Sequence, residues 1–132
     1  MTLWTGAPYD YARSADGLVF TAGACPLDEN GDVVEPGDVL RQAERAAENL
    51  LAALADAGCG ADSLLKTTIY VVASERADLV RAWEVVSLRF GRAPSTLLGV
   101  SFLGYPGQLV EIEAVARAAD AEEEAALPRP PR

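Results

Sequence analysis

The chain has 132 residues, the length of one ordinary domain, and half of them are hydrophobic, so a conventional core can form without staples or metals. It carries 11 basic and 20 acidic residues, a net charge of −9, and no histidine. An acidic chain without a basic cluster disfavours nucleic-acid binding. Without histidine the chain lacks the commonest general base and the usual zinc ligands, and no carboxylate cluster stands out as a metal site.

The sequence has no membrane or export signal that we recognise. No apolar run approaches the ~20 residues that span a bilayer, and the N-terminus lacks a basic region followed by an apolar stretch. Cys25 and Cys59 are too few for a disulfide framework and are expected to be reduced thiols. We therefore expect a cytoplasmic protein with no membrane association.

The first predicted elements are a strand and a hairpin. Leu18–Cys25 is apolar and rich in β-formers, and we expect a strand buried on both faces. Asn30-Gly31 is the strongest two-residue hairpin signal, and Val33 and Val34 would begin a short returning strand. Pro36-Gly37 would end that strand.

Two helices and a strong strand follow. From Leu40 the apolar spacing becomes that of a helix, with Asp38 as its N-cap and Gly58 at its end. Leu64–Ala73 predicts a second strand. A second helix is expected from about Arg76 to Phe90. The apolar positions on the two helices are Leu40, Ala43, Ala47, Leu50 and Leu54, then Leu79, Trp83, Val86 and Phe90.

Two further strands, Ser95–Leu103 and Leu109–Ala118, are expected, joined through a Gly-Tyr-Pro-Gly loop. The order β-β-α-β-α-β-β indicates an α+β domain over residues 1–118, with two helices on one face of a mostly antiparallel sheet. Strands this apolar rarely leave a face to water, so other subunits are expected to cover the second face. Residues 119–132 are acidic and proline-rich and are expected to form a mobile tail.

Five blocks of the chain match one known family in order and spacing. They are Ala7-Pro-Tyr9, Leu18–Pro26, the helix positions Gln42, Asn49 and Gly58, Lys66–Val71 and Glu111–Ala116. Together they resemble the RidA/YjgF family, also called endoribonuclease L-PSP-like, over roughly residues 7–117. The resemblance implies a chorismate-mutase-like fold and a homotrimer with outward helices and three intersubunit clefts.

The resemblance also implies a chemistry. Family deaminases hydrolyse enamines and imines such as 2-aminoacrylate, with no metal or cofactor. Glu111 lies at the position of the family's water-positioning glutamate, and the motif match favours that role. The alternative is a solvent-facing strand glutamate, since Glu113 alternates with it on the same face. Tyr9 matches a cleft tyrosine that would close the pocket; alternatively, it only packs.

Three positions depart from the family pattern. The Pro-Ala-Arg-Ser/Thr signature falls at Ala93–Thr96, which places Ser95 where the family has its substrate-binding arginine and keeps Thr96 beside it. Serine offers one weak donor in place of a rigid two-donor fork for a carboxylate. Ala22 replaces a strand serine, and Trp83 falls near a pocket asparagine. All three changes make the predicted pocket less polar.

Arg92, Arg13 and Cys25 are further candidates for the same cleft. Arg92 precedes Ser95 by three residues and would replace the missing cation if its loop turned inward; Arg13 is a second candidate. Solvated side chains are the ordinary alternative for both. Cys25 would line the cleft, either as a buried structural thiol or as a nucleophile, and it has no histidine to activate it.

Two functions remain open from the sequence. The first is a divergent hydrolase or deaminase of an imine, enamine or related small organic substrate, with Glu111 holding water. The second is a non-catalytic small-molecule-binding or regulatory trimer on the same scaffold. Ribonuclease activity is the weakest alternative because the chain is acidic and lacks histidine. Canonical activity on amino-acid-derived imines is doubtful without the arginine.

Overall fold

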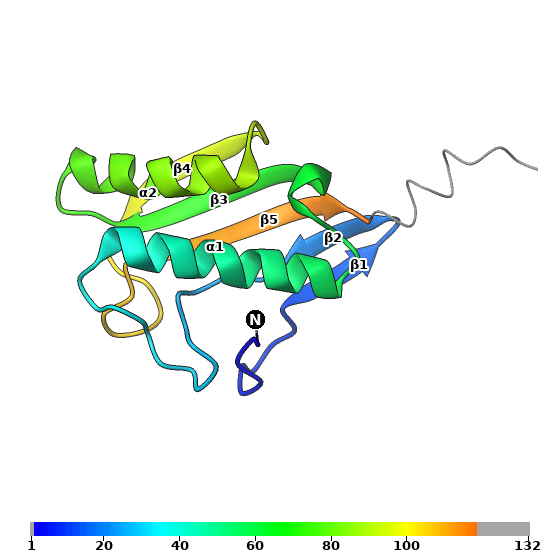
Figure 1. Cartoon of the computed structure of the whole chain (residues 1–132), viewed down its shortest axis with the longest axis horizontal. Coiled ribbons are helices and arrows are strands. Elements are labelled where there is room, and N and C mark those ends of the chain that lie inside the picture. The colour runs from blue at the N-terminus through cyan, green and yellow to red at the C-terminus, as the bar shows by residue number, and fades with distance from the viewer. Residues whose placement is uncertain (1, 119–132) are drawn as a thin grey trace, which may run out of the picture.

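A five-stranded sheet carries two helices on one face in the computed structural model, which describes residues 2–118 (Figure 1). The predicted tail at 119–132 lies outside the described residues. The strands are β1 (Ala12–Ala15), β2 (Leu18–Thr21), β3 (Leu64–Val72), β4 (Ser95–Val100) and β5 (Val110–Arg117). The helices are α1 (Val39–Asp56) and α2 (Arg76–Phe90), with a 3-10 turn, η1 (Ala61–Ser63), before β3.

The strand order is β1-β2-β5-β3-β4, with β3 and β4 parallel and every other pair antiparallel. This architecture confirms the predicted α+β class. The last two strands are not neighbours, because β3 lies between β4 and β5. Among the described residues, neither helix is long and apolar enough to cross a membrane.

Helix α1 begins and ends where its sequence predicts. The carboxylate of Asp38 accepts a hydrogen bond from the backbone N–H of Arg41 at 3.0 Å and so caps the first turn. Gly58 follows the helix at a φ of +81°, a conformation that glycine adopts at low cost. The apolar positions face the sheet, except Leu40 at the first turn, which is exposed.

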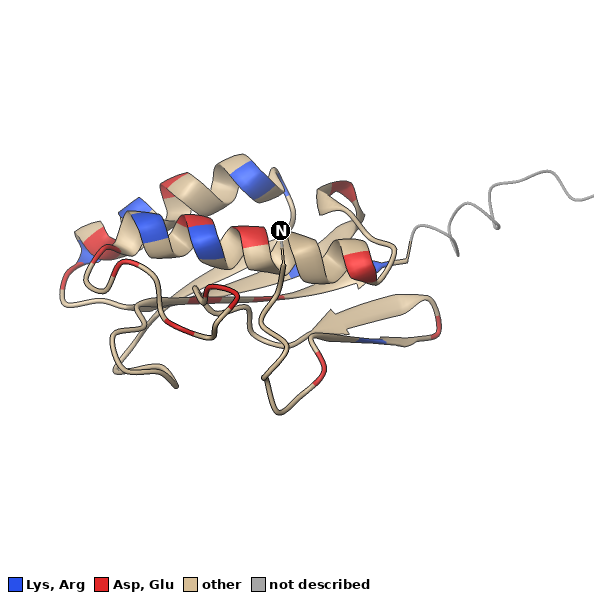
Figure 2. Cartoon of the chain, turned by 60° about the horizontal axis from the view of Figure 1, so that its bottom comes forward, with Lys and Arg blue, Asp and Glu red and all other residues tan. Residues whose placement is uncertain are grey.

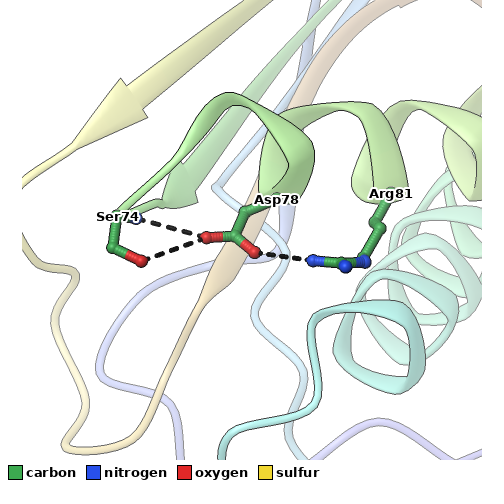
Figure 3. Close-up of polar contacts among 3 residues, drawn as sticks. All are labelled: Ser74, Asp78 and Arg81. Atoms are coloured by element: carbon green, nitrogen blue, oxygen red, sulfur yellow. Dashed lines mark hydrogen bonds and ion pairs between the residues drawn. The ribbon is translucent and has the colours of Figure 1, made fainter.

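Helix α2 is held at its start by a carboxylate inside its first turn. Asp78 accepts hydrogen bonds from the backbone N–H of Ser74 at 3.2 Å and from its hydroxyl at 3.4 Å (Figure 3). Its other oxygen accepts from Arg81 at 3.0 Å, an i,i+3 pair on the helix surface. The predicted stripe is wrong at one position, because Ala82 is buried where Trp83 was expected, and the Trp83 side chain is 38% exposed.

The sheet has one covered face and one open face. Buried side chains of β5 and β3 alternate toward the helices, among them Ile112, Ala114 and Ile69. Across the register, Tyr70 pairs with both Leu98 and Glu111, and these side chains share the other face. No helix of residues 2–118 covers that face, which also carries Phe20, 48% exposed.

The N-terminal hairpin differs from the prediction. It joins β1 to β2 through Asp16 and Gly17, whose φ values of +52° and +79° are those of a type I′ turn. Strand β1 was missed because Ala12–Ala15 is polar, exposed and poor in β-formers. The expected hairpin at Asn30-Gly31 is reduced to one isolated bridge between Leu27 and Val33, since prolines lie on both sides of it.

The predicted strand Leu18–Cys25 is interrupted after Thr21 by a β-bulge. Phe20 pairs with Val115, and the pairing with β5 resumes at Ala24 opposite Ile112. The chain thus advances four residues from Phe20 to Ala24 while β5 advances three, which is the extra residue of a bulge. In the gap, the backbone N–H of Ala114 donates to the hydroxyl of Thr21 at 2.9 Å instead of to a strand carbonyl. The prediction of one long strand buried on both faces is therefore wrong, and the bulge turns the following residues across the end of β5.

Candidate functional site

The bulge brings the residues after β2 against Glu111 on β5. A cavity of about 530 Å³ opens there, and four of the predicted site residues line it together. Its lining is Tyr9, Ala22, Gly23, Cys25, Gly104, Tyr105 and Glu111. Residues from four separate stretches of the chain therefore meet at one opening.

One oxygen of the Glu111 carboxylate is held by two donors. The thiol of Cys25 donates to Oε1 at 3.3 Å, and the side-chain amide of Gln108 donates to the same oxygen at 3.2 Å. Among residues 2–118, Oε2 has no hydrogen-bond partner and lies over Gly23, whose added Cβ would meet it at 2.1 Å. Glu111 thus presents one oriented oxygen with capacity to accept a further hydrogen bond.

Gln108 orients the carboxylate from the loop before β5. Its side chain is 3% exposed; its amide donates also to the carbonyl of Val110 at 3.1 Å, and its oxygen accepts from the backbone N–H of Tyr105 at 3.2 Å. A buried side chain with three partners besides its own backbone has little freedom to turn. Gln108 therefore couples the loop that carries Tyr105 to the position of Glu111.

Two side chains of helix α1, on the covered face of the sheet, hold the segments on either side of the cavity. The amide of Asn49 donates to the carbonyls of Cys25 and Leu27, each at 2.9 Å. Gln42, fully buried, donates to the carbonyl of Gly107 at 2.9 Å and accepts from the backbone N–H of Leu109 at 2.7 Å. These two side chains anchor the Cys25 segment and the 104–108 loop to one rigid element.

The environment raises the pKa of two groups at this site. Burial, reinforced by the negative charge of Glu111, raises the pKa of the Cys25 thiol to about 12. Burial also raises the pKa of the Tyr9 hydroxyl. Both groups are therefore neutral near pH 7, which leaves Glu111 as the anionic side chain of the cavity lining. A neutral thiol that donates to a carboxylate is a poor nucleophile.

The remaining predicted residues lie elsewhere in the single chain. Ser95 donates to the carbonyl of Ala93 at 3.0 Å and accepts from the buried hydroxyl of Thr67 at 2.5 Å, so its hydroxyl is engaged within the chain. Thr96 accepts from Lys66 at 2.6 Å. Trp83 lies exposed on α2, and a separate groove beyond the end of that helix includes Arg92.

Arg13 lies on exposed β1, where it pairs with Asp10 at 2.6 Å, and it does not line the cavity. The structure thus brings together Tyr9, Ala22, Cys25 and Glu111 within one chain. For Trp83, Arg92, Ser95 and Thr96, a place in the cleft depends on a second subunit and stays a prediction.

Four site residues were missed in the sequence: Gly23, Gly104 and Tyr105, which line the cavity, and Gln108, which orients Glu111. Gly23 carries the usual signal of a glycine inside a strand pattern, a bulge with a close approach of another group, and here that group is the Glu111 carboxylate. Gln108 is a polar residue between a turn and the apolar start of a strand, and its neighbours in the sequence do not reveal its contact with Glu111.

Comparison with known proteins identifies the family of the chain. Residues 3–118 match the family model described as endoribonuclease L-PSP. The chain belongs to the RidA/YjgF family. It is 33% identical over 111 residues to a RutC family protein of Pyrococcus abyssi, which covers 83% of this chain and 85% of the relative. It is 30% identical over 110 residues to the mouse 2-iminobutanoate/2-iminopropanoate deaminase, over 83% of this chain and 80% of that enzyme.

Solved structures of RidA/YjgF proteins share the fold. A member of the YjgF/YER057c/UK114 family from Mycobacterium tuberculosis superposes with a TM-score of 0.72 at 27% identity, over 89% of this chain and 98% of that one. TdcF of E. coli, determined with bound serine, gives a TM-score of 0.76 at 25% identity, over 88% and 92% of the two chains. The predicted family and fold are thereby confirmed.

Proposed function

We propose that this RidA/YjgF protein hydrolyses an imine, enamine or related small organic substrate, with Glu111 positioning the attacking water. The single observation that carries the proposal is the state of the Glu111 carboxylate. Oε1 is fixed by Cys25 and Gln108, and Oε2 has no hydrogen-bond partner among residues 2–118 at a cavity of about 530 Å³. A fixed carboxylate with one available oxygen is what a general base needs.

The reaction balances with water alone. Glu111 accepts a proton from water as the oxygen attacks the carbon of a protonated imine, which gives a tetrahedral amino alcohol. The carboxyl group returns the proton to nitrogen, and Glu111 then takes the hydroxyl proton as the C–N bond breaks and the carbonyl forms. The departing ammonia takes up that proton, so that a carbonyl compound and ammonium are the products. An enamine first gains a proton on carbon to become the imine. The deaminase name of the mouse relative supports this class of reaction.

We further propose that the cleft is completed between subunits of a homotrimer in the cytosol. The open sheet face bears Phe20 and Leu98, 48% and 43% exposed, and Phe102 beyond β4 is 82% exposed. A second copy of the chain would remove these apolar side chains from water. Light scattering on the full chain is expected to give a mass near three times 13.9 kDa.

The experiment follows imine loss with and without the protein, using 2-aminoacrylate and a panel of imines and enamines generated in situ and trapped with semicarbazide. Wild-type protein should compete with the trap for at least one compound. Glu111→Gln should remove that turnover and leave the subunit mass unchanged. The matched control is Glu113→Gln, two residues along β5, whose carboxylate accepts from Tyr70 at 2.5 Å on the open face outside the cavity lining.

Loss of turnover in Glu113→Gln but not in Glu111→Gln would overturn the assignment. If no compound is hydrolysed while small ligands still raise the melting temperature, the chain is a binding protein and not a hydrolase. The engaged hydroxyl of Ser95 is the observation that favours that second function, because it removes a donor from the predicted substrate grip.

A further inference from the structure

The lining of the cavity contains an acidic side chain and no basic one among residues 2–118. Glu111 is its anionic side chain, and the other lining residues are two tyrosines, a neutral cysteine and small residues. No lysine or arginine of residues 2–118 lines it. Within one chain, a bound carboxylate would therefore lie close to the Glu111 carboxylate with no lysine or arginine in the lining to compensate it. Burying an unpaired charge is unfavourable.

None of the nine lysines and arginines of residues 2–118 lines this opening. Most of them lie along the two helices, as Figure 2 shows. Three lie on strands: Lys66 and Arg13 are paired with Thr96 and Asp10, and Arg117 is the last residue of β5, at the opposite end from Glu111. Arg92 lies in the loop between α2 and β4. The helix cations are Arg41 and Arg45 on α1 and Arg76, Arg81 and Arg89 on α2.

The aromatic lining favours the opposite charge. Tyr9 is 43% exposed and lines the cavity together with Tyr105 of the 104–108 loop. Aromatic faces attract ammonium and iminium groups, and they also pack against apolar substituents. The net charge of −9 adds a field that attracts cations to the molecule.

We propose that the cavity selects its substrate by charge and takes the protonated imine of a primary amine that carries an apolar or aromatic group and no carboxylate. The positively charged iminium group would lie beside the Glu111 carboxylate, whose Oε2 keeps the attacking water, and the substituent would lie against Tyr9 and Tyr105. This inference rests on the proposed hydrolysis and adds the substrate class. The reaction that supplies such a substrate is the two-electron oxidation of a primary amine, and the products here are an aldehyde or ketone and ammonium.

A binding experiment tests the charge selection without turnover. The probes are 2-phenylethylammonium and 3-phenylpropanoate, which carry the same ring and opposite charges, titrated into the full chain by calorimetry. The ammonium is expected to bind at least ~10-fold more tightly. Glu111→Gln should abolish that preference and Glu113→Gln should retain it. Equal or tighter binding of the carboxylate, no binding of either probe, or a preference unchanged in Glu111→Gln would overturn the inference.

A turnover experiment separates this inference from the proposed function. An amine oxidase acting on 2-phenylethylamine and an amino-acid oxidase acting on phenylalanine yield two imines that differ by one carboxylate. Faster hydrolysis of the carboxylate-free imine supports the inference. Faster hydrolysis of the amino-acid imine, lost in Glu111→Gln, overturns the inference and leaves the hydrolase proposal standing; further loss in Arg92→Ala would identify Arg92 as the cation.

If neither imine is hydrolysed and the ammonium probe still binds through Glu111, the charge selection stands. In that case it is the hydrolase proposal that fails.

Discussion

A methyl group added at Gly23 should displace the Glu111 carboxylate and leave the backbone fold in place. In Gly23→Ala the new Cβ would lie 2.1 Å from Oε2, 2.6 Å from Cδ and 2.8 Å from Cγ of Glu111. Ordinary contact begins near 3.5 Å, so the carboxylate must retreat by more than ~1 Å. Because a flexible side chain yields before backbone does, Glu111 would leave its bonds with Cys25 and Gln108.

The expected magnitudes follow from those contacts. Losing the two hydrogen bonds of a half-buried carboxylate costs about 1–3 kcal/mol of the free energy of unfolding, measured by urea denaturation. A misplacement of ~1 Å at the reacting centre reduces kcat by about 10²-fold in the imine assay. Gly99→Ala is the matched control, since its Cβ meets only Leu79 at 3.9 Å and both quantities should stay near wild type. Full turnover in Gly23→Ala would refute the reasoning that this contact places the carboxylate.

Three further outcomes are expected. Burial and the charge of Glu111 raise the pKa of the Cys25 thiol to about 12, so the thiol should react slowly with iodoacetamide at pH 8. The midpoint of the rate against pH, followed by peptide mapping, should lie near the raised pKa and should fall in Glu111→Gln. A wild-type midpoint near the ordinary thiol value of about 8.5 would contradict the geometry. Gln42→Leu should lower the free energy of unfolding, measured in urea, by about 2–4 kcal/mol, because it leaves the N–H of Leu109 and the carbonyl of Gly107 without their partners. A decrease below about 0.5 kcal/mol would contradict the anchoring role of Gln42. Asp38→Ala should lower the free energy of unfolding by about 1 kcal/mol through loss of the N-cap, with Asp38→Asn near wild type as the control.

The helices and central strands could be predicted because their signals are local. Asp38, the apolar spacing of α1 and Gly58 each act within a few residues, and α1 spans Val39–Asp56 as expected. The alternation in β5 likewise placed Ile112 in the core and Glu111 on the opposite face.

The first two strands were harder to predict because their pairing with other strands, and not their local sequence, decides where they form. Strand β1 has little β-propensity and exists because the Asp16-Gly17 turn folds it onto β2. The strand breaks after Thr21 because the Thr21 hydroxyl, instead of a backbone carbonyl, accepts the hydrogen bond of Ala114, and because the Glu111 carboxylate lies over Gly23. Neither contact is visible within the segment, since both partners come from a strand about 90 residues later along the chain.

The candidate site was predictable only in its family-matched part. Tyr9, Ala22, Cys25 and Glu111 line one cavity of the single chain, and their role as a site stays a prediction. Gln108, which orients Glu111, depends on a contact formed by the folded loop. The inward hydroxyl of Ser95 follows from the parallel register with Thr67, and that register needs β3 and β4 to be placed side by side.

Chemical rescue tests the role of Glu111 most directly. Glu111→Ala removes the carboxylate and leaves space beside Gly23 that formate can occupy. The account predicts that the variant is inactive on the imine of 2-phenylethylamine and that added formate restores turnover in a saturable manner, with no effect on wild-type protein. Activity retained by Glu111→Ala without formate would contradict the claim that this carboxylate holds the attacking water.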